Sequence, residues 1–421
     1  MNSIERMSYL SARWPTRIAL QRCYRHWDSS HRFLPVLWYF PEGVSEVSFV
    51  LLNWRKKMRM LLLRSAALPA ALFVSLLCMQ PAAHAQGCVA AHSPQPIIAG
   101  LNPTNESTIA HSAGTSFLHG LTISTGYRVY NSYRHYIGTV YQEQRQAQHS
   151  AVVNHVNLFE LDLNYQVTPR LSVIASIPGM EASRHGQSSP LNAYHSGGIG
   201  DVTVGVQSWV FRPPTESHGN VAISAQLKLP TGINDAKGTK TSSNGSTTTL
   251  PFDESIQPGD GTWGFSLGTE AYRELYWHTS TYFTGSWLFS PQDTTGVATG
   301  RGAPGEGVVS AADQYLWRGG FSRPITGVKP LRGLALSIGG RMEGVPVRDA
   351  FGSSNGFRRP GYVISIEPGM MYEHGRWGLY ASGPWAMERN RKTSVTDLAN
   401  QTHGDAAFSD YTVIAGMSRT F

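Results

Sequence analysis

The sequence predicts an all-β fold, a single antiparallel transmembrane β-barrel of about 12 strands with long extracellular loops and short periplasmic turns. Three observations predict it. The chain ends in a period-two pattern that closes on an aromatic residue, segments with the same alternation recur over residues 117–421, and the connections between these segments alternate in length.

The C-terminal segment has the pattern of a final barrel strand. Counted back from the end, alternate positions are Phe421, Arg419, Met417, Ala415, Val413 and Tyr411. The last strand of a closed barrel must pair with the first, and the assembly machinery binds that free end. We therefore expect Tyr411, Val413 and Phe421 to form the C-terminal assembly signal. Arg419 departs from the pattern, because an apolar or aromatic residue is more usual there.

Alternation of apolar and polar residues predicts the strands. In 159–167, for example, the odd positions are apolar or aromatic and the even positions are Glu160, Asp162, Asn164 and Gln166. Most segments have close to the roughly 9–11 residues that a tilted membrane strand needs. The expected strands lie near 120–130, 159–167, 171–178, 201–211, 221–229, 263–273, 276–289, 313–324, 331–345, 359–373, 376–390 and 410–421.

The connections between these strands alternate between long and short. In chain order they are 131–151, 169–170, 179–200, 211–219, 231–262, 274–275, 290–312, 324–330, 346–358, 374–375 and 391–409. Short turns on the periplasmic side and long loops outside are typical of outer-membrane barrels. A secreted β-sandwich also has alternating strands, but it explains neither this alternation nor the terminal Phe421.

Tryptophans add a weaker signal, because any large β-protein buries them. All those after residue 85 fall within the predicted strands, several near a strand end, where aromatic rings form girdles at the membrane interface. They are Trp209, Trp263, Trp277, Trp287, Trp317, Trp377 and Trp385.

The first part of the chain has the pattern of an export signal. An apolar run at 61–79 follows basic residues and precedes Ala83-His84-Ala85, so we expect a signal peptide over 58–85, cleaved after Ala85. A transmembrane helix is the alternative, but prolines interrupt the run. We interpret 1–57 as a mis-annotated upstream extension and 86–116 as a periplasmic lead-in or plug. Cys88 is expected to be a free thiol, with lipidation as the alternative.

Charge supports this division. The chain has 35 Lys and Arg against 28 Asp and Glu; residues 1–85 hold 11 and 4 of these, which leaves 24 of each beyond Ala85. The basic excess therefore belongs to the leader and gives no reason to expect nucleic acid as a partner. The expected partners are outer-membrane lipids and lipopolysaccharide, the barrel assembly machinery and a small-molecule solute.

Four short phrases resemble a known family. They are Gly200-Asp201-Val202-Thr203-Val204-Gly205, Leu227-Lys228-Leu229-Pro230-Thr231-Gly232, Gln257-Pro258-Gly259-Asp260-Gly261 and Gly356-Phe357-Arg358-Arg359-Pro360-Gly361 with Glu367-Pro368-Gly369. Together they resemble the outer-membrane barrel family named after the MetA pathway of phenol degradation, over roughly 117–421. The resemblance implies a channel for small molecules, aromatic ones included.

The alternation assigns polar residues to the lumen. The candidates for a constriction are Arg128, Glu160, Asp162, Lys228, Glu270, Arg318, Arg341, Glu343 and Glu367, and Gln207 and Gln226 should share that face. Opposed charges can form a selective constriction, or they can be salt bridges that hold the barrel shape. A ring of one sign, which would indicate ion selectivity, is not evident.

Two extracellular segments stand out. Arg348, Asp349, Arg358 and Arg359 cluster in one predicted loop, either as a gate or anion site or as structural pairs that fold the loop inward. Residues 233–262 are rich in Lys, Thr, Ser and Gly, which predicts a flexible, solvated loop that is able to contact surface sugars.

We expect no catalytic site, cofactor or metal site. His185 with Ser188 and His195 with Ser196 are local pairs of a base and a nucleophile, but no surrounding motif supports them. The expected function is an outer-membrane channel for passive uptake or efflux of small molecules, hydrophobic or aromatic ones included. The alternatives are a structural or adhesin-type barrel acting through its loops, and a phospholipase-like hydrolase using His185 or His195.

Overall fold

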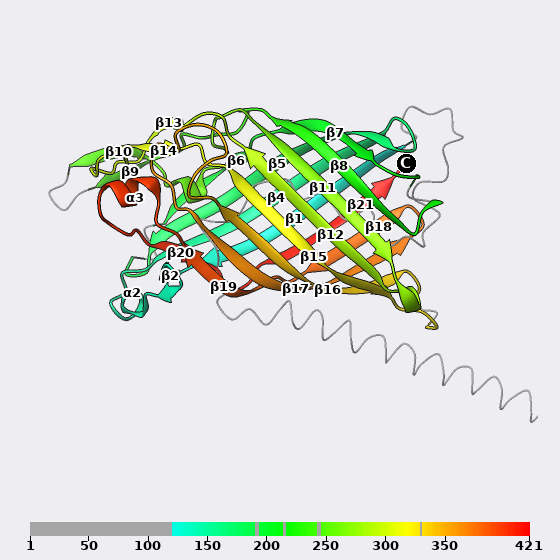
Figure 1. Cartoon of the computed structure of the whole chain (residues 1–421). Helices are drawn as coiled ribbons and strands as arrows, with labels where there is room; N and C mark the ends of the chain where they lie inside the picture. The colour runs from blue at the N-terminus through cyan, green and yellow to red at the C-terminus, as the bar shows by residue number, and fades with distance from the viewer. Residues whose placement is uncertain (1–119, 190–192, 214–215, 242–245, 329–330) are drawn as a thin grey trace, which may run out of the picture. The chain divides into compact units, whose positions relative to one another are not determined.

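The computed structural model describes residues 120–189, 193–213, 216–241, 246–328 and 331–421 (Figure 1). The chain divides into two compact units at Gln80, and all described residues belong to the second. The upstream extension, the signal peptide, the lead-in and Cys88 lie outside the described residues. No helix among the described residues is both long and apolar enough to cross a membrane.

The described residues build one closed antiparallel ring. Its segments are β1 (Leu121–Ser132), β4 (Val152–Gln166), β5 (Leu171–Gly186), β6 (Tyr194–Ile199), β7 (Thr203–Trp209), β8 (Gly219–Lys228), β11 (Gly264–Glu274), β12 (Ser280–Phe289), β15 (Gln314–Pro324), β16 (Leu334–Val345), β17 (Gly361–His374), β18 (Trp377–Ser382), β19 (Trp385–Arg391) and β21 (Val413–Thr420).

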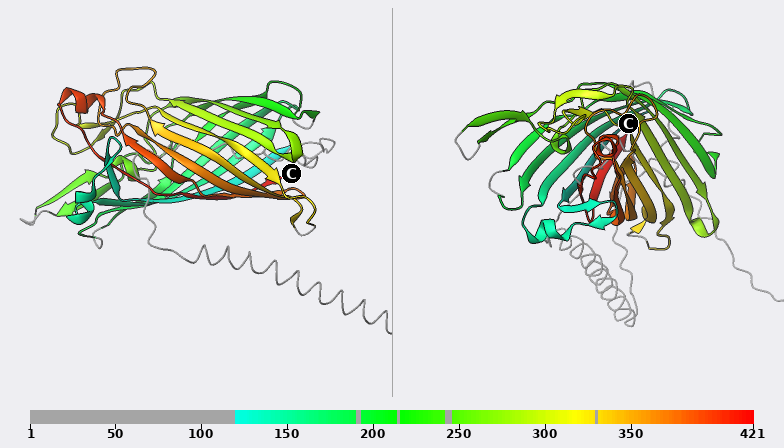
Figure 2. Two further views of the ribbon diagram at one scale, coloured as in Figure 1. Left: turned by 60° about the horizontal axis from the view of Figure 1, so that its bottom comes forward. Right: turned by 60° about the vertical axis from the view of Figure 1, so that its left-hand side comes forward.

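Twelve wall strands close the barrel. β6 and β7 both pair with β5, and β18 and β19 both pair with β17, so each couple is one wall strand in two parts. The ring closes where β21 pairs with β1, with Met417 opposite Thr125. Figure 2 shows that neighbouring strands run in opposite directions and are tilted, and that the C-terminus lies at the end of the barrel opposite the long loops.

The sequence alternation explains why the strands form a membrane wall. On β8, Ile223 and Leu227 point outward and are exposed, whereas Asn220, Ser224 and Lys228 point inward and are buried. Every second residue of a strand faces the same side. Exposed apolar side chains recur in the same way on the other wall strands, so the outer surface is an apolar belt and the lumen is polar.

The predicted strands are confirmed, and two expectations about their ends are wrong. The loop expected at 179–200 is mostly strand, because β5 continues to Gly186 and β6 starts at Tyr194, which pairs with Arg184. The prediction failed here because backbone pairing between these strands continues beyond the residues that alternate between apolar and polar. Trp277 lies not in a strand but in the turn η3 (Tyr276–His278), where its φ is 57°, and Trp263 precedes β11.

The long loops carry secondary structure of their own at one end of the barrel (Figure 1). Antiparallel pairs are β9 (Lys237–Thr241) with β10 (Thr247–Pro251) and β13 (Thr294–Ala298) with β14 (Val308–Ser310). β2 (Arg134–Ile137) pairs with β3 (Val140–Tyr141) and β20 (Ala406–Phe408). Short helices are α2 (Glu143–Ala147), η2 (Glu254–Ile256) and α3 (Val395–Ala399).

Candidate functional site

Five charged side chains from four strands form a continuous set of contacts inside the barrel, here named the lumen ion-pair chain. Arg128 Nη2 on β1 lies 2.7 Å from Glu343 Oε1 on β16. Arg341 Nη2 lies 3.0 Å from Glu343 Oε2, and its Nη1 lies 3.9 Å from Glu367 Oε1 on β17. Arg318 Nη2 on β15 completes the set at 3.2 Å from Glu367 Oε1.

The lumen ion-pair chain crosses the lumen. β1 and β16 are not neighbours in the ring, since β21, the β18–β19 strand and β17 lie between them, so Arg128 reaches Glu343 through the interior. All five residues are at most 9% exposed. Buried charges are stable only when they are paired, and removal of one partner typically costs about 3–5 kcal/mol. These pairs therefore hold the wall and narrow the lumen at the same time.

The other predicted lumen residues also face inward but do not join this chain. Glu160 Oε1 accepts a hydrogen bond from Ser176 Oγ at 2.9 Å. Asp162 follows it on the same face of β4, and Glu270 on β11 lies beside Gln207. Lys228 lies at the end of β8 and pairs with Asp260, with Asp201 at 3.6 Å.

Part of the loop between β8 and β11 (residues 229–263), the segment around η2, folds into the barrel mouth, whereas the described residues of β10 are mostly exposed. The turn η2 buries Ile256 completely against Tyr130, Met180 and two neighbouring residues. Those partners lie on the inner faces of β1, β4 and β5, since they alternate with exposed outward residues. The expectation of a solvated, flexible loop is wrong for this part, because its apolar residue is buried in the barrel mouth.

A group of four charged residues, here named the rim latch, fixes η2 in place. Arg359, from the loop after β16, donates to Asp253 at 2.6 and 2.9 Å and to Glu254 at 3.0 Å. Arg184 on β5 lies 3.2 Å from Asp253. Burial by itself raises the pKa of Asp253, but the Arg184 and Arg359 guanidinium groups hold it well below its ordinary value. Burial raises the pKa of Glu254, against the opposing effect of Arg359.

Three glycine-containing segments meet where this loop leaves and re-enters the wall, here named the glycine crossing. Asp201 Oδ1 accepts from the Gly232 backbone N–H, and Asp201 Oδ2 from that of Asp260, both at 2.9 Å. A Cβ on Gly232 would lie 2.7 Å from the carbonyl carbon of Gly200 and 2.8 Å from Cα of Gly259. Only glycine fits there. Three of the four phrases that carried the family resemblance therefore meet at one place.

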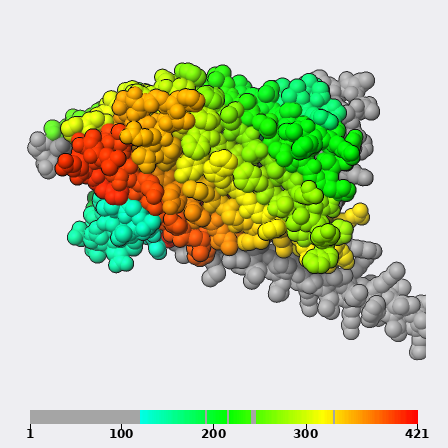
Figure 3. Space-filling view, in the orientation of Figure 1, coloured from blue at the N-terminus to red at the C-terminus, as the bar shows by residue number. Residues whose placement is uncertain are grey.

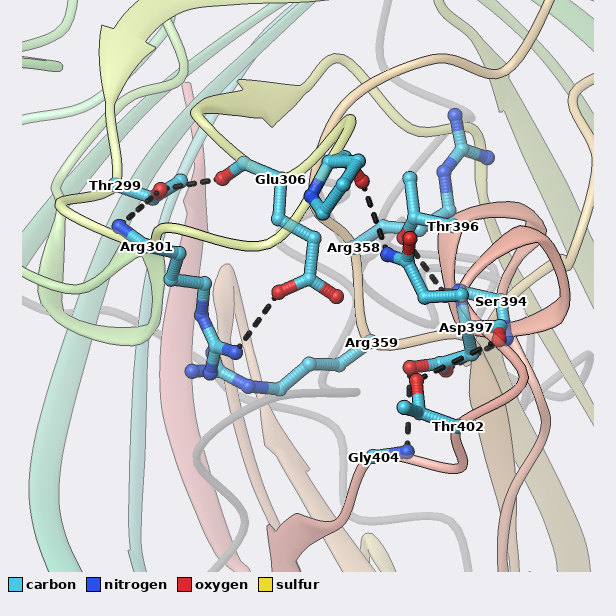
Figure 4. Close-up of polar contacts among 12 residues, drawn as sticks. Thr299, Arg301, Glu306, Arg358, Arg359, Ser394, Thr396, Asp397, Thr402 and Gly404 are labelled. Atoms are coloured by element: carbon cyan, nitrogen blue, oxygen red, sulfur yellow. Dashed lines mark hydrogen bonds and ion pairs between the residues drawn. The ribbon is translucent and has the colours of Figure 1, made fainter.

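The predicted Arg–Asp cluster pairs in the loops above the lumen. Arg358 donates to both carboxylate oxygens of Asp349, through Nη1 at 2.7 Å, and to Ser310 Oγ. Arg359 belongs to the rim latch instead, and Arg348 is exposed. Figure 4 shows Arg358 and Arg359 beside the Arg301–Glu306 pair, and Figure 3 shows the loops packed together at this end.

A cavity of about 200 Å³ lies in the lumen between these two sets of charges. Arg128, Arg318 and Tyr380 line one part, and Glu254, Arg358 and Arg359 line the part under the loops. Apolar groups complete its wall. A cavity of about 150 Å³ is large enough for benzene, so this one accommodates a molecule of one ring.

Neither predicted base–nucleophile pair is joined by a hydrogen bond among the described residues. His195 is exposed and Ser196 is buried, because successive residues of β6 face opposite sides of the wall. His185 Nδ1 contacts the Gly186 carbonyl oxygen at 3.0 Å, and its ring stacks on His155. Neither arrangement gives a nucleophile–base hydrogen bond of the kind that hydrolysis needs.

Sequence reasoning missed the inward fold of the η2 segment and with it Arg184, Asp253 and Asp201. The available signal was Asp253-Glu254-Ser255-Ile256, an acidic pair followed by one apolar residue in a polar loop. An acidic residue that precedes a short helix caps it, as Asp253 does by accepting from the Ser255 N–H.

No protein-family model matches the chain, and no curated protein matches it. Solved structures do. An outer-membrane channel of the COG4313 group from Pseudomonas putida F1 is 14% identical, with a TM-score of 0.49 over 72% of this chain and 96% of that one. The β domain of the Bordetella autotransporter Brka is 14% identical, with a TM-score of 0.41 over 72% and 100%. The Pseudomonas putida toluene transporter TodX is 11% identical, with a TM-score of 0.37 over 80% and 96%.

These three proteins have different roles on barrel folds. The location of this chain follows from its own geometry, because an edgeless ring of strands with an apolar outer belt and a polar interior is the structure that spans an outer membrane. The protein is an outer-membrane β-barrel.

Proposed function

We propose that this protein is an outer-membrane channel for passive movement of small molecules, hydrophobic and aromatic ones included. The observation that carries the proposal is the cavity of about 200 Å³ inside a closed barrel, between the lumen ion-pair chain and the inward-folded loop. Its size fits a single ring. Its lining combines apolar side chains with charged ones of both signs, and apolar walls with fixed polar groups are typical of small-molecule sites.

Two features restrict the path. On one side the lumen ion-pair chain crosses the lumen, and on the other η2 and the rim latch fill part of the mouth. A solute that is larger than the cavity requires the 229–263 loop to move. The channel is therefore expected to pass small solutes slowly and to exclude large ones, unlike a wide porin.

We also propose membership of the outer-membrane family named after the MetA pathway of phenol degradation. Support comes from the positions of its phrases, which form the glycine crossing, the rim latch at Arg359 and the Glu367 contacts of the lumen ion-pair chain. TodX, named a toluene transporter, has the same kind of solute that this family implies.

Export and assembly complete the proposal. The leader at 58–85 would direct the chain outward, with the assembly machinery binding the strand that ends at Phe421. The Phe421 backbone N–H donates to the Leu121 carbonyl oxygen at 2.9 Å, so the C-terminus lies at the closing seam. The apolar belt supports contact with lipid, and lipopolysaccharide is the proposed neighbour of the loop end.

Two measurements on the purified full chain test the function. In planar bilayers we expect small conductance steps, and in liposomes we expect faster uptake of phenol than of a disaccharide. Empty liposomes provide the baseline. If the wild-type chain and the variant Arg359→Gln, which opens the rim latch, both leave conductance and uptake at that baseline, the channel proposal is wrong.

A further inference from the structure

Two arginines in the cavity wall have a buried donor that no residue of the described structure accepts. Nε of Arg128 and Nε of Arg318 have no hydrogen-bond partner, although the Nη groups of the same side chains pair with Glu343 and Glu367. The two side chains are 6% and 9% exposed, and both line the cavity. Buried donors without a partner are rare and costly, so the arginine wall lacks an acceptor.

The charge of this wall favours an anionic acceptor. The lumen ion-pair chain contains three arginines and two glutamates, so one positive charge is not balanced within it. The guanidinium group presents Nε–H and one Nη–H as a parallel pair, which matches the two oxygens of a carboxylate. A carboxylate would supply the missing acceptor and balance the charge of the lumen ion-pair chain itself, in addition to Glu270, whose charge also acts on Arg318.

The other residues that line the cavity determine the chemical character of the rest of the ligand. Leu158, Leu288, Val345 and Ile414 provide apolar contacts. Glu160 also lines the cavity, where it accepts from Ser176. Its carboxylate disfavours a second acid group on the ligand at that side, since like charges repel strongly at low dielectric.

We infer that the cavity binds a small organic monoanion, a single carboxylate on an aromatic or short aliphatic body, with the carboxylate against the arginine wall of Arg128 and Arg318. The inference rests on the proposed function, because it names the chemical class of solute for the same cavity. The uncharged ring of such a ligand occupies the apolar part of the cavity.

Equilibrium binding to the purified full chain tests it, with benzoate, benzylamine and toluene as probes of similar size and different charge. We expect benzoate to bind at least tenfold more tightly than benzylamine or toluene, a difference of about 1.4 kcal/mol. In Arg128→Lys and Arg318→Lys the cation that faces the glutamate remains, but the Nε donor is lost. Each change should weaken benzoate binding at least tenfold.

Arg389→Lys is the matched control, because Arg389 is a half-buried, paired arginine outside the cavity that bonds Asp410 and the Ser409 carbonyl oxygen. Its benzoate affinity should stay within twofold of the wild type. Heat-modifiable migration in gels shows whether each variant is a folded barrel. Two lysine substitutions provide independent tests if one of them disturbs folding.

Equal affinity for benzoate and benzylamine would overturn the inference, as would unchanged benzoate affinity in both folded lysine variants. The result is separate from the proposed function. Conductance without benzoate binding would show that the carboxylate inference is wrong and that the channel proposal still holds. Benzoate binding without conductance or uptake would show that the channel proposal is wrong and that the binding site still exists.

Discussion

Replacement of Arg359 by glutamine should release the inward-folded loop. Arg359 is 6% exposed and donates three charge-assisted hydrogen bonds, at 2.6, 2.9 and 3.0 Å, to Asp253 and Glu254. Loss of one partner from a buried ion pair costs about 3–5 kcal/mol. Here the cost lies at the lower end of that range, because Arg184 still neutralises Asp253 at 3.2 Å and the two carboxylates are partly exposed.

A value of about 3 kcal/mol for the latch predicts the size of the effect. Since about 1.4 kcal/mol corresponds to a tenfold change in an equilibrium constant, the ratio of open to closed loop should rise roughly a hundredfold. Single-channel recording in planar bilayers measures this ratio as total open time divided by total closed time. The substitution Asp253→Asn tests the same contact from its other side, and the double variant should show much less than the sum of the two effects.

Arg389→Gln is the control for a lost arginine pair, since Arg389 bonds Asp410 at 2.6 Å and does not belong to the rim latch. It should leave open probability unchanged. If folded Arg359→Gln has a ratio of open to closed time within threefold of the wild type, the rim latch does not hold the loop, and the reasoning from burial and pairing is refuted.

Three further outcomes are expected. Because the pKa of Asp253 is depressed, its stabilisation of the closed loop is present above the ordinary aspartate pKa of 3.8 and is lost only well below that value. The open probability should therefore be the same at pH 7 and at pH 5. A steep rise in open probability as the pH falls from 7 to 5 would show that Glu254, and not Asp253, holds the loop. Gly232→Ala should lower the free energy of unfolding of the barrel by about 1–3 kcal/mol through overpacking, as measured by urea unfolding. Gly340→Ala is the control and should leave it unchanged, because a Cβ at Gly340 has no atom within 4 Å. Arg419→Leu should change the unfolding free energy by no more than about 1 kcal/mol, because the guanidinium group only stacks on Trp377 and Phe421 at 5.0 and 4.7 Å; a larger loss would show an unrecognised contact.

The wall strands could be predicted because their signal is local. Lipid on one side and a polar lumen on the other impose a period of two on each strand separately, as on β8, without reference to any other strand. Strand ends were harder. The extension of β5 to Gly186 and the start of β6 at Tyr194 depend on pairing between two segments beyond the apolar belt, and that pairing leaves no period-two apolar pattern.

The candidate site was predicted in its parts but not in its assembly. Alternation assigned Arg128 and Glu343 to the same lumen, yet 215 residues separate them in sequence. Only closure of the ring between β21 and β1 brings them to 2.7 Å. Alternation assigned Glu160 to the same face in the same way, and the structure leaves it outside the ion-pair chain.

The sequence by itself determined an outer-membrane barrel, its strand number and the end of the barrel that carries the long loops, because membrane partitioning acts residue by residue. The tertiary structure alone decided that the η2 segment folds inward, that Arg359 fixes it to Asp253, and that two donors of the arginine wall have no acceptor among the described residues. Those features depend on which distant charges meet once the ring has closed. No local sequence pattern specifies which carboxylate an arginine pairs with, since the arginine occupies the same period-two position in every case.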